Sequence, residues 1–239
     1  LRAAATIGYA LRLRRRPPGP AEALRNWTGE TVSFLHQIAA APFPSAEAHS
    51  VPVAAEAPTT TASVVDVIIP VHDAAEETLR CIDSVLRSRN RTETEIVVID
   101  DASTDPELLR KLEVLAQAGL ITLLRNEENR GFPATANRGM ALHTDRDVVL
   151  LNSDTCVHAD WLDRLRQTAL SDWNVATVTP FSNNAEICSY PDLCRPSPMP
   201  PPDELAALDD LIARVNCGRS LSLFTAVGFC TYIRRAALS

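Results

Sequence analysis

Apolar runs and helix-spaced apolar positions alternate along the chain between residues 64 and 179. Residues 148–151 are four apolar residues in a row, which predicts a strand buried on both faces. Between two such runs, Leu79, Ile82, Val85 and Leu86 fall on one face of a helix. The pattern predicts strands at residues 65–70, 95–100, 120–124, 148–151 and 175–178. It predicts helices at residues 75–88, from Pro106 onward, at 133–143 and at 159–169. This alternation is typical of an α/β fold with a mainly parallel, open sheet flanked by helices.

Both ends of the chain depart from this alternation. Residues 181–203 are rich in proline and predict an irregular loop, followed by a helix at 204–215 and a strand at 223–233. In the first part, residues 11–16 predict a basic helix end, 21–39 a helix and 42–63 a linker. We therefore expect two parts, a partly disordered helical and linker segment at 1–63 and an α/β domain at 64–239.

Charge and cysteine content narrow the classes of function. The formal net charge is −7, and the first 62 residues hold more Arg than acidic residues, so the predicted α/β domain is strongly acidic. Such a domain is a poor surface for nucleic acid, and we expect no nucleic-acid partner. The six cysteines include no C-x-x-C pair and are expected to be reduced thiols, although Cys188 and Cys194 could pair under oxidation.

The sequence also predicts a cytoplasmic protein. The longest uncharged candidate for a membrane span, residues 221–233, is shorter than the roughly 20 apolar residues that a span needs. The order of basic and apolar residues at the start does not fit a signal peptide. The basic run at 11–16 suits either contact with anionic lipid at the inner face of the membrane or a solvated segment. Since the chain begins without Met, we expect it to be an excerpt of a longer protein.

Four polar clusters follow the predicted strands. They are His72-Asp73, Asp100-Asp101, Asn129-Arg130-Gly131 with Asn137, and Asn152-Ser153-Asp154. Because crossovers between parallel strands are right-handed, all four clusters are expected at the carboxyl edge of one sheet, where ligands of open α/β folds bind. Each cluster alone is explained better by a turn or a helix cap than by a site. Their coincidence at one edge predicts a binding site.

The first turn lacks the sequence motifs by which many nucleotide-binding folds hold a phosphate. Residues 70–74, Pro-Val-His-Asp-Ala, contain no glycine, so the dinucleotide-binding fingerprint is absent, and no Walker lysine loop is present in the sequence. A divalent cation on Asp154 is the remaining economical way to hold a phosphorylated ligand.

These motifs together resemble glycosyltransferase family 2, whose members have the GT-A fold. The resemblance covers roughly residues 64–238. Residues 70–73 resemble the first-strand motif of the family, and 98–105 its acidic turn. Residues 129–132 with 136–139 resemble its third motif, and 152–154 stand at its Asp-x-Asp metal motif. Residues 179–184 and 227–229 further resemble the rhamnosyltransferase-like branch.

The resemblance implies a role for each candidate residue. Pro70, His72 and Asp73 would line the nucleotide pocket, and Asp101 would hydrogen-bond the base. Residues beside the nucleoside and ribose would be Arg130, Asn137, Asn152 and Ser153. Asp154 would bind Mg2+ or Mn2+ bridging the diphosphate of a UDP-, dTDP- or GDP-linked sugar. Displacement by an acceptor hydroxyl on a glycan or lipid-linked acceptor would invert the anomeric centre, as in polysaccharide synthesis.

Two departures from the family pattern shape these expectations. Asn152 stands where the first Asp of the metal motif is usual, so it can hydrogen-bond a ribose hydroxyl but adds no charge. The general base of the family lies in an acidic motif after the strand that contains residues 227–229, and we expect it beyond Ser239. The 239-residue chain is then expected to bind donor but to be inactive in transfer. If the base lies within the chain, Asp209 and Asp210 are the first candidates.

Two other functions stay open at this point. One is a non-catalytic nucleotide-sugar-binding domain that keeps the fold. The other is a sugar-phosphate nucleotidyltransferase, although such enzymes usually carry a glycine-rich, basic loop after the first strand, which this sequence lacks.

Overall fold

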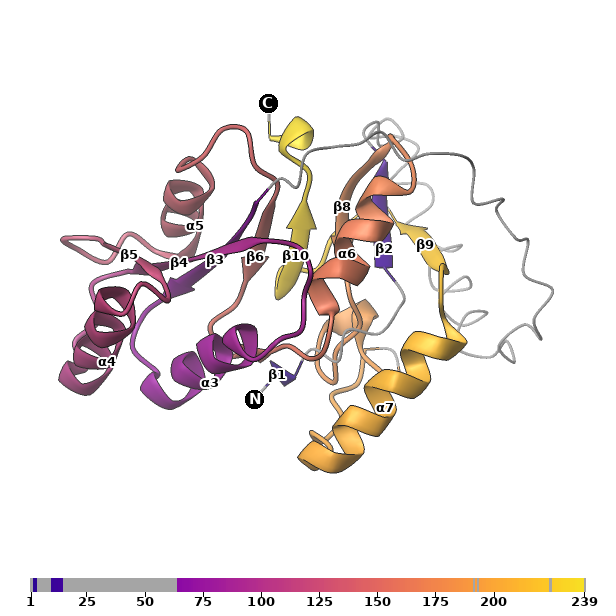
Figure 1. Ribbon diagram of the computed structural model, residues 1–239, viewed down its shortest axis with the longest axis horizontal. Helices are drawn as coiled ribbons and strands as arrows, with labels where there is room; N and C mark the ends of the chain where they lie inside the picture. Colours follow the sequence, from indigo (N-terminus) through magenta and orange to yellow (C-terminus); the bar gives the residue numbers. More distant parts are fainter. Residues whose placement is uncertain are drawn as a thin grey trace.

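The computed structural model describes residues 2–3, 10–14, 64–190, 192, 194–223 and 225–238. Its main sheet has eight strands in the order β5-β4-β3-β6-β10-β8-β2-β9 (Figure 1). The strands are β2 (Ala10–Arg14), β3 (Val65–Val71), β4 (Thr94–Asp100), β5 (Thr122–Arg125), β6 (Val148–Leu151), β8 (Val175–Thr179), β9 (Ser220–Leu223) and β10 (Cys230–Ile233). A second, two-stranded sheet pairs β1 (Arg2–Ala3) with β7 (Thr155–Cys156).

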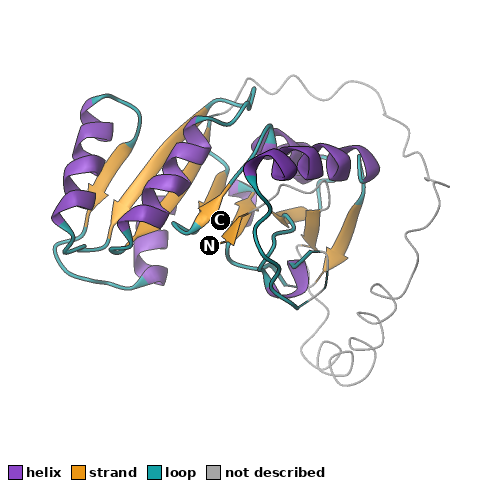
Figure 2. Cartoon of the chain, turned by 90° about the horizontal axis from the view of Figure 1, so that it is seen from below, coloured by secondary structure: helices purple, strands orange, loops and turns teal. Residues whose placement is uncertain are grey.

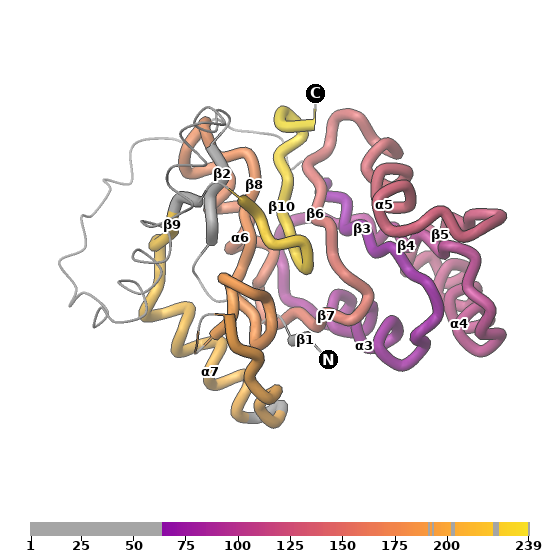
Figure 3. The backbone as a smooth tube through the Cα atoms, turned by 180° about the vertical axis from the view of Figure 1, so that it is seen from behind, coloured from indigo at the N-terminus to yellow at the C-terminus, as the bar shows by residue number. Residues whose placement is uncertain are grey.

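The sheet is parallel from β5 through β4 and β3 to β6, as the alternating pattern predicts. β10 then runs antiparallel between β6 and β8, which Figure 3 shows from behind. The mainly parallel sheet flanked by helices confirms the fold class expected from the sequence.

Helices cover both faces of the sheet (Figure 2). The helices are α3 (Ala75–Leu86), α4 (Pro106–Gln117), α5 (Phe132–Met140), α6 (Trp161–Leu170) and α7 (Pro202–Val215), with short 3-10 turns η1 (Glu186–Cys188) and η2 (Arg235–Ala237). α4 starts with Pro106 at its first position, and the side chain of Asp105 accepts hydrogen bonds from the backbone N–H groups of Glu107 and Leu108. None of the helices among the described residues is long and apolar enough to cross a membrane.

Two of the predictions at the ends of the chain are wrong. The expected helix end in residues 11–16 is instead a strand over Ala10–Arg14, which pairs with both β8 and β9. The single strand expected at 223–233 is two strands, β9 and β10, separated by residues that include a turn at Gly228 and Phe229. The helix expected at 21–39 lies outside the described residues, and the domain boundary at residue 63 stays a prediction.

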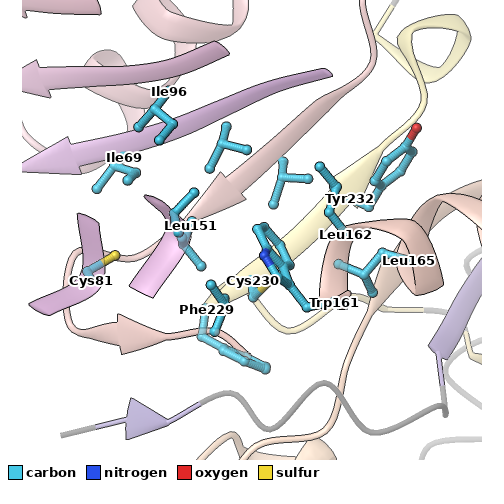
Figure 4. Close-up of a cluster of buried hydrophobic side chains, with 14 of the residues drawn as sticks. Ile69, Cys81, Ile96, Leu151, Trp161, Leu162, Leu165, Phe229, Cys230 and Tyr232 are labelled. Carbon is cyan, nitrogen blue, oxygen red and sulfur yellow. The ribbon is translucent and has the colours of Figure 1, made fainter. Parts of the chain in front are cut away.

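The larger hydrophobic core lies between the sheet and helices α3, α4 and α6. Trp161, Phe229 and Tyr232 are among its largest fully buried side chains, and Leu151 and Cys230 join them where β6 meets β10 (Figure 4). All six cysteines are free in the structure, in agreement with the expectation of reduced thiols.

A smaller core on the opposite face is closed by α5. It consists of Ile68, Val97, Ile99 and Val148. Gly139 of α5 faces it so closely that a Cβ atom there would lie 2.6 Å from Cγ2 of Ile68 and 2.7 Å from Cδ1 of Ile99. The absence of a side chain at this position therefore sets how closely α5 approaches the sheet.

We predict that Gly139→Ala lowers the free energy of unfolding by about 1–3 kcal/mol, the usual cost of overpacking a core. A loss of stability is informative because replacing glycine by alanine in a helix interior ordinarily raises the free energy of unfolding by about 1 kcal/mol. Urea denaturation measures the change. Adding Ile99→Val removes Cδ1, the atom that would lie 2.7 Å from the new Cβ, so the double variant should lose less than the sum of the two single losses. A Gly139→Ala variant as stable as the original chain would contradict the close approach.

Candidate active site

A cavity of about 360 Å³ opens at the carboxyl edge of the parallel strands. The end of β3, the segments that follow β3, β4 and β6, and the first turn of α5 contribute its walls. The lining residues are Pro70, Val71, His72, Ala74, Asp101, Phe132, Thr135, Asn152, Ser153 and Asp154. Six of the nine residues proposed from the sequence thus share one cavity: Pro70, His72, Asp101, Asn152, Ser153 and Asp154.

The other three proposed residues do not line this cavity. Asp73 faces the neighbouring turn, where its carboxylate accepts hydrogen bonds from the backbone N–H groups of Thr104 at 2.7 Å and Asp105 at 3.1 Å. These two bonds lower the pKa of Asp73. Arg130 and Asn137 have exposed side chains. The nucleoside contacts expected of these three residues stay predictions.

Asp101 organises the loop between β5 and α5. Its Oδ1 accepts hydrogen bonds from Nδ2 of Asn126 at 2.6 Å and from the backbone N–H of Arg130 at 2.9 Å, and its Oδ2 accepts from the N–H of Gly131 at 2.9 Å. Burial alone would raise the pKa of Asp101, but these donors and Thr135 hold it below its usual value. Asp101 is thus a carboxylate that stays charged in a largely buried position.

His72 is fixed through both of its ring nitrogens. Nδ1 lies 2.9 Å from the backbone carbonyl oxygen of Asp101, and Nε2 lies 3.1 Å from Nδ2 of Asn129. Since a carbonyl oxygen only accepts, Nδ1 is the donor toward Asp101, while Nε2 faces the amide of Asn129 and lies 4.0 Å from Oδ2 of Asp73. A ring held in this way has no nitrogen left to bind a metal, and it contributes a flat, polar-edged wall to the cavity.

The turn after β6 carries the oxygen atoms suited to a cation. Its backbone is anchored where the N–H of Asn152 donates to the carbonyl of Phe229 at 2.9 Å and Sγ of Cys81 donates to the carbonyl of Asn152 at 3.5 Å. Oδ1 of Asn152 is buried and has no hydrogen-bond partner among the residues that the structure describes. Asp154 lines the same cavity, so the two side chains offer oxygen atoms of the kind that Mg2+ and Mn2+ bind.

Asp66, Glu95 and His143 form a second cluster of potential metal ligands, at the opposite edge of the sheet. Asp66 and Glu95 stand near the starts of the adjacent strands β3 and β4, far along the strands from the cavity. Nη1 of Arg146 already lies 2.9 Å from Asp66 and 2.6 Å from Glu95, and hydrogen bonds from Thr122 and Arg146 lower the pKa of Glu95. This cluster is therefore an ion-pair network that ties the strand starts together.

Sequence reasoning missed several residues of the site. Val71 and Ala74 are next to predicted residues of the first turn, and Phe132 belongs to the third motif. Thr135 follows Phe132 by one helical turn, so the spacing of α5 could have indicated it. No pattern indicated Asn126, because it follows a strand and resembles an ordinary loop residue.

The chain belongs to glycosyltransferase family 2, because the sequence profile described as glycosyl transferase family 2 matches residues 66–239. Family and sheet topology together identify the fold as GT-A. The human polypeptide N-acetylgalactosaminyltransferase 14 is 35% identical over 45% of this chain and 19% of its own length. The glycosyltransferase AglE of Haloferax volcanii is 28% identical over 44% of this chain and 35% of its own length. The chain thus spans about a fifth to a third of the length of these relatives.

The chain also resembles a solved structure, the mannosyltransferase PcManGT from Pyrobaculum calidifontis in complex with GDP-mannose and Mn2+. The two are 25% identical over 47% of this chain and 34% of the other, with a TM-score of 0.38.

We predict that Asp101→Ala weakens nucleotide binding about tenfold to a hundredfold while the chain stays folded, because the charged acceptor of two loop N–H groups is lost. Isothermal titration calorimetry with a nucleoside diphosphate measures the affinity. Asp83→Ala, which removes an exposed carboxylate from α3, is the matched control and should bind as the original chain does. Equal affinity of the folded Asp101→Ala variant would reduce Asp101 to a turn residue.

Proposed function

We propose that this chain is the donor-binding part of an inverting, metal-assisted glycosyltransferase that uses a nucleotide-diphosphate sugar. The observation that carries the proposal is the cavity at the carboxyl edge of the sheet. Aromatic and apolar walls, from His72, Phe132 and Pro70, lie in the same cavity as the oxygen ligands of Asn152 and Asp154. Membership of glycosyltransferase family 2 supports transfer of a sugar over nucleotide transfer to a sugar phosphate.

The walls of the cavity suit the nucleoside, and the turn after β6 suits the diphosphate. His72 is held rigidly and Phe132 is 46% exposed, so both offer ring surface to a planar base. Asp154, with Asn152 beside it, would hold Mg2+ or Mn2+. Bound there, the cation would neutralise charge on the departing nucleoside diphosphate.

The proposed reaction is a single displacement. The oxygen of an acceptor hydroxyl forms a bond to the anomeric carbon as the bond from that carbon to the diphosphate oxygen breaks. The acceptor proton passes to a general base, and the configuration at the anomeric carbon inverts. We propose a glycan or lipid-linked acceptor and a cytoplasmic setting, as expected from the sequence, with synthesis of cell-surface polysaccharide as the role.

A nucleoside diphosphate should stabilise the chain only together with a divalent cation. The reason is that the first turn offers neither lysine nor glycine for phosphate, whereas Asp154 offers a carboxylate. Melting temperatures with UDP, dTDP and GDP, each with Mn2+ or with chelator, measure the stabilisation, which follows mass action.

Asp154→Asn should abolish the metal-dependent part of this shift. Asp145→Asn is the matched control, because Asp145 is exposed and precedes the opposite end of β6. Equal shifts with metal and with chelator would overturn the role of the cation.

The two acidic residues first considered as bases are engaged elsewhere. Asp209 is buried and forms a two-point pair with Arg164, whose Nη1 and Nη2 lie 3.1 Å and 2.8 Å from its two oxygens. Asp210 is 68% exposed and pairs with Arg214 one turn further along α7. Neither lines the cavity. The base expected beyond Ser239 stays a prediction.

We accordingly predict that Asp210→Asn leaves turnover of the donor unchanged in a longer chain that extends past Ser239, measured as nucleoside diphosphate released with a panel of acceptor glycans. Asp209→Asn should instead lower the free energy of unfolding by about 3 kcal/mol, because it leaves Arg164 without its buried charged partner. Loss of a general base costs typically about 10²–10⁴-fold in rate. A loss of that size in a folded Asp210→Asn variant would identify Asp210 as the base.

A further inference from the structure

The side chain of Asn126 lies at the meeting point of three elements that build the cavity. It follows β5 directly, is 7% exposed, and its backbone N–H donates to the carbonyl of Asp100 at the end of β4 at 2.8 Å. Its Nδ2 lies 2.6 Å from Oδ1 of Asp101 and 2.9 Å from Oγ1 of Thr135 in α5. Its Oδ1 accepts a hydrogen bond from Nη1 of Arg138 at 2.6 Å.

These contacts fix which way the amide points. A guanidinium only donates, so Arg138 requires the oxygen of Asn126 on its side, and both N–H bonds then point at Asp101 and Thr135. Every polar atom of the side chain is engaged. Asn126 itself does not line the cavity, although Asp101 and Thr135 do.

The consequence reaches the cavity wall through Asp101. Oδ1 of Asp101 receives both the Asn126 amide and the N–H of Arg130, while Oδ2 receives the N–H of Gly131. The next residue is Phe132, which lines the cavity at the start of α5. The orientation of the Asp101 carboxylate therefore sets the position of the loop that presents Phe132.

We propose that Asn126 is a positioning residue for the nucleotide pocket, acting through Asp101 on the loop at residues 129–132. The proposal rests on the proposed function, since it assigns a role in binding the nucleotide of the donor. Asn126 orients the carboxylate of Asp101 through its side-chain amide, which does not titrate. The pocket therefore keeps its shape over the pH range in which Asp101 stays ionised.

Several charged or titratable groups surround this contact. Arg138 of α5 touches Asn126, and Arg125 of β5 lies 3.7 Å from the carboxylate of Asp100. The ring of His72, from the turn after β3, contacts the backbone carbonyl of Asp101. An added carboxylate at position 126 would therefore face Asp101 directly, with Arg138 on its other side.

The test is Asn126→Asp, which keeps the shape and the acceptor for Arg138 but replaces the amide donor. Two carboxylates in such contact do not both ionise readily, so they share one proton at low pH and repel each other at high pH. Affinity for UDP, dTDP or GDP with Mn2+, whichever the original chain binds, is measured at about pH 5 and about pH 8.5. At each pH, the affinity of the original chain is divided by that of the variant. We expect this ratio to be near one at the lower pH and to reach about tenfold at the higher pH.

Hydrogen exchange gives a readout that does not depend on nucleotide. In Asn126→Asp at the higher pH, the amides of Arg130 and Gly131 should lose protection, while amides in the middle of β3 keep theirs. Asn90→Asp is the matched control, because Asn90 is a partly buried asparagine whose Oδ1 accepts from the N–H of Leu162 away from the cavity. It should show neither effect. Melting temperatures show whether each variant is folded at each pH.

If Asn126→Asp unfolds at the higher pH, Asn126→Ala decides the question, with weaker binding and weaker protection expected at both pH values. If a folded Asn126 variant matches the original chain in affinity and in amide protection at the higher pH, that result would overturn this inference but not the proposed function. A chain that binds no nucleotide at either pH overturns the proposed function and this inference with it.

Discussion

The in-register pairing of β3 with β4 is the constraint on which the site depends. Val71 and Asp100 are the last paired residues of the two strands, so the turns that follow leave the sheet side by side. The turns are then cross-linked: the N–H of Asp73 donates to Oγ of Ser103 at 2.9 Å, and the N–H of Asp101 donates to the carbonyl of Val71 at 2.7 Å. A shift of one residue in this register would turn the alternating side chains to opposite faces and separate these contacts.

Much of the parallel half could be predicted from the sequence because its signals are local. Buried parallel strands appear as continuous apolar runs, and the polar residues after them had to meet at one edge once the crossover rule was applied. The cavity accordingly contains Asp101 and the three residues 152–154 that the pattern indicated. The single strand predicted at residues 223–233 is wrong because Gly228, where the chain turns before β10, was counted as part of one apolar run.

What could not be predicted depends on partners distant in sequence. Asp101 lines the cavity as expected, and its hydrogen bond to a base stays a prediction. That Asn126, Arg130 and Gly131 donate to its carboxylate could not be foreseen, because no spacing rule shows which loop returns to it. Asp209 lies in a helix with no motif, and only the structure shows that Arg164 of α6 neutralises it. Such contacts are specified by packing between elements, which a single sequence does not display.

The position of β10 has a consequence for how the chain is made. β6 pairs with β3 on one side and with β10 on the other, and residues 230–233 of β10 come far later in the sequence. During synthesis, β3 to β6 can assemble from one continuous stretch of chain, while the outer edge of β6 still lacks its final partner. A long interval of translation therefore separates an open, strongly apolar strand edge from the segment that covers it, and in that interval pairing with another nascent chain competes with folding.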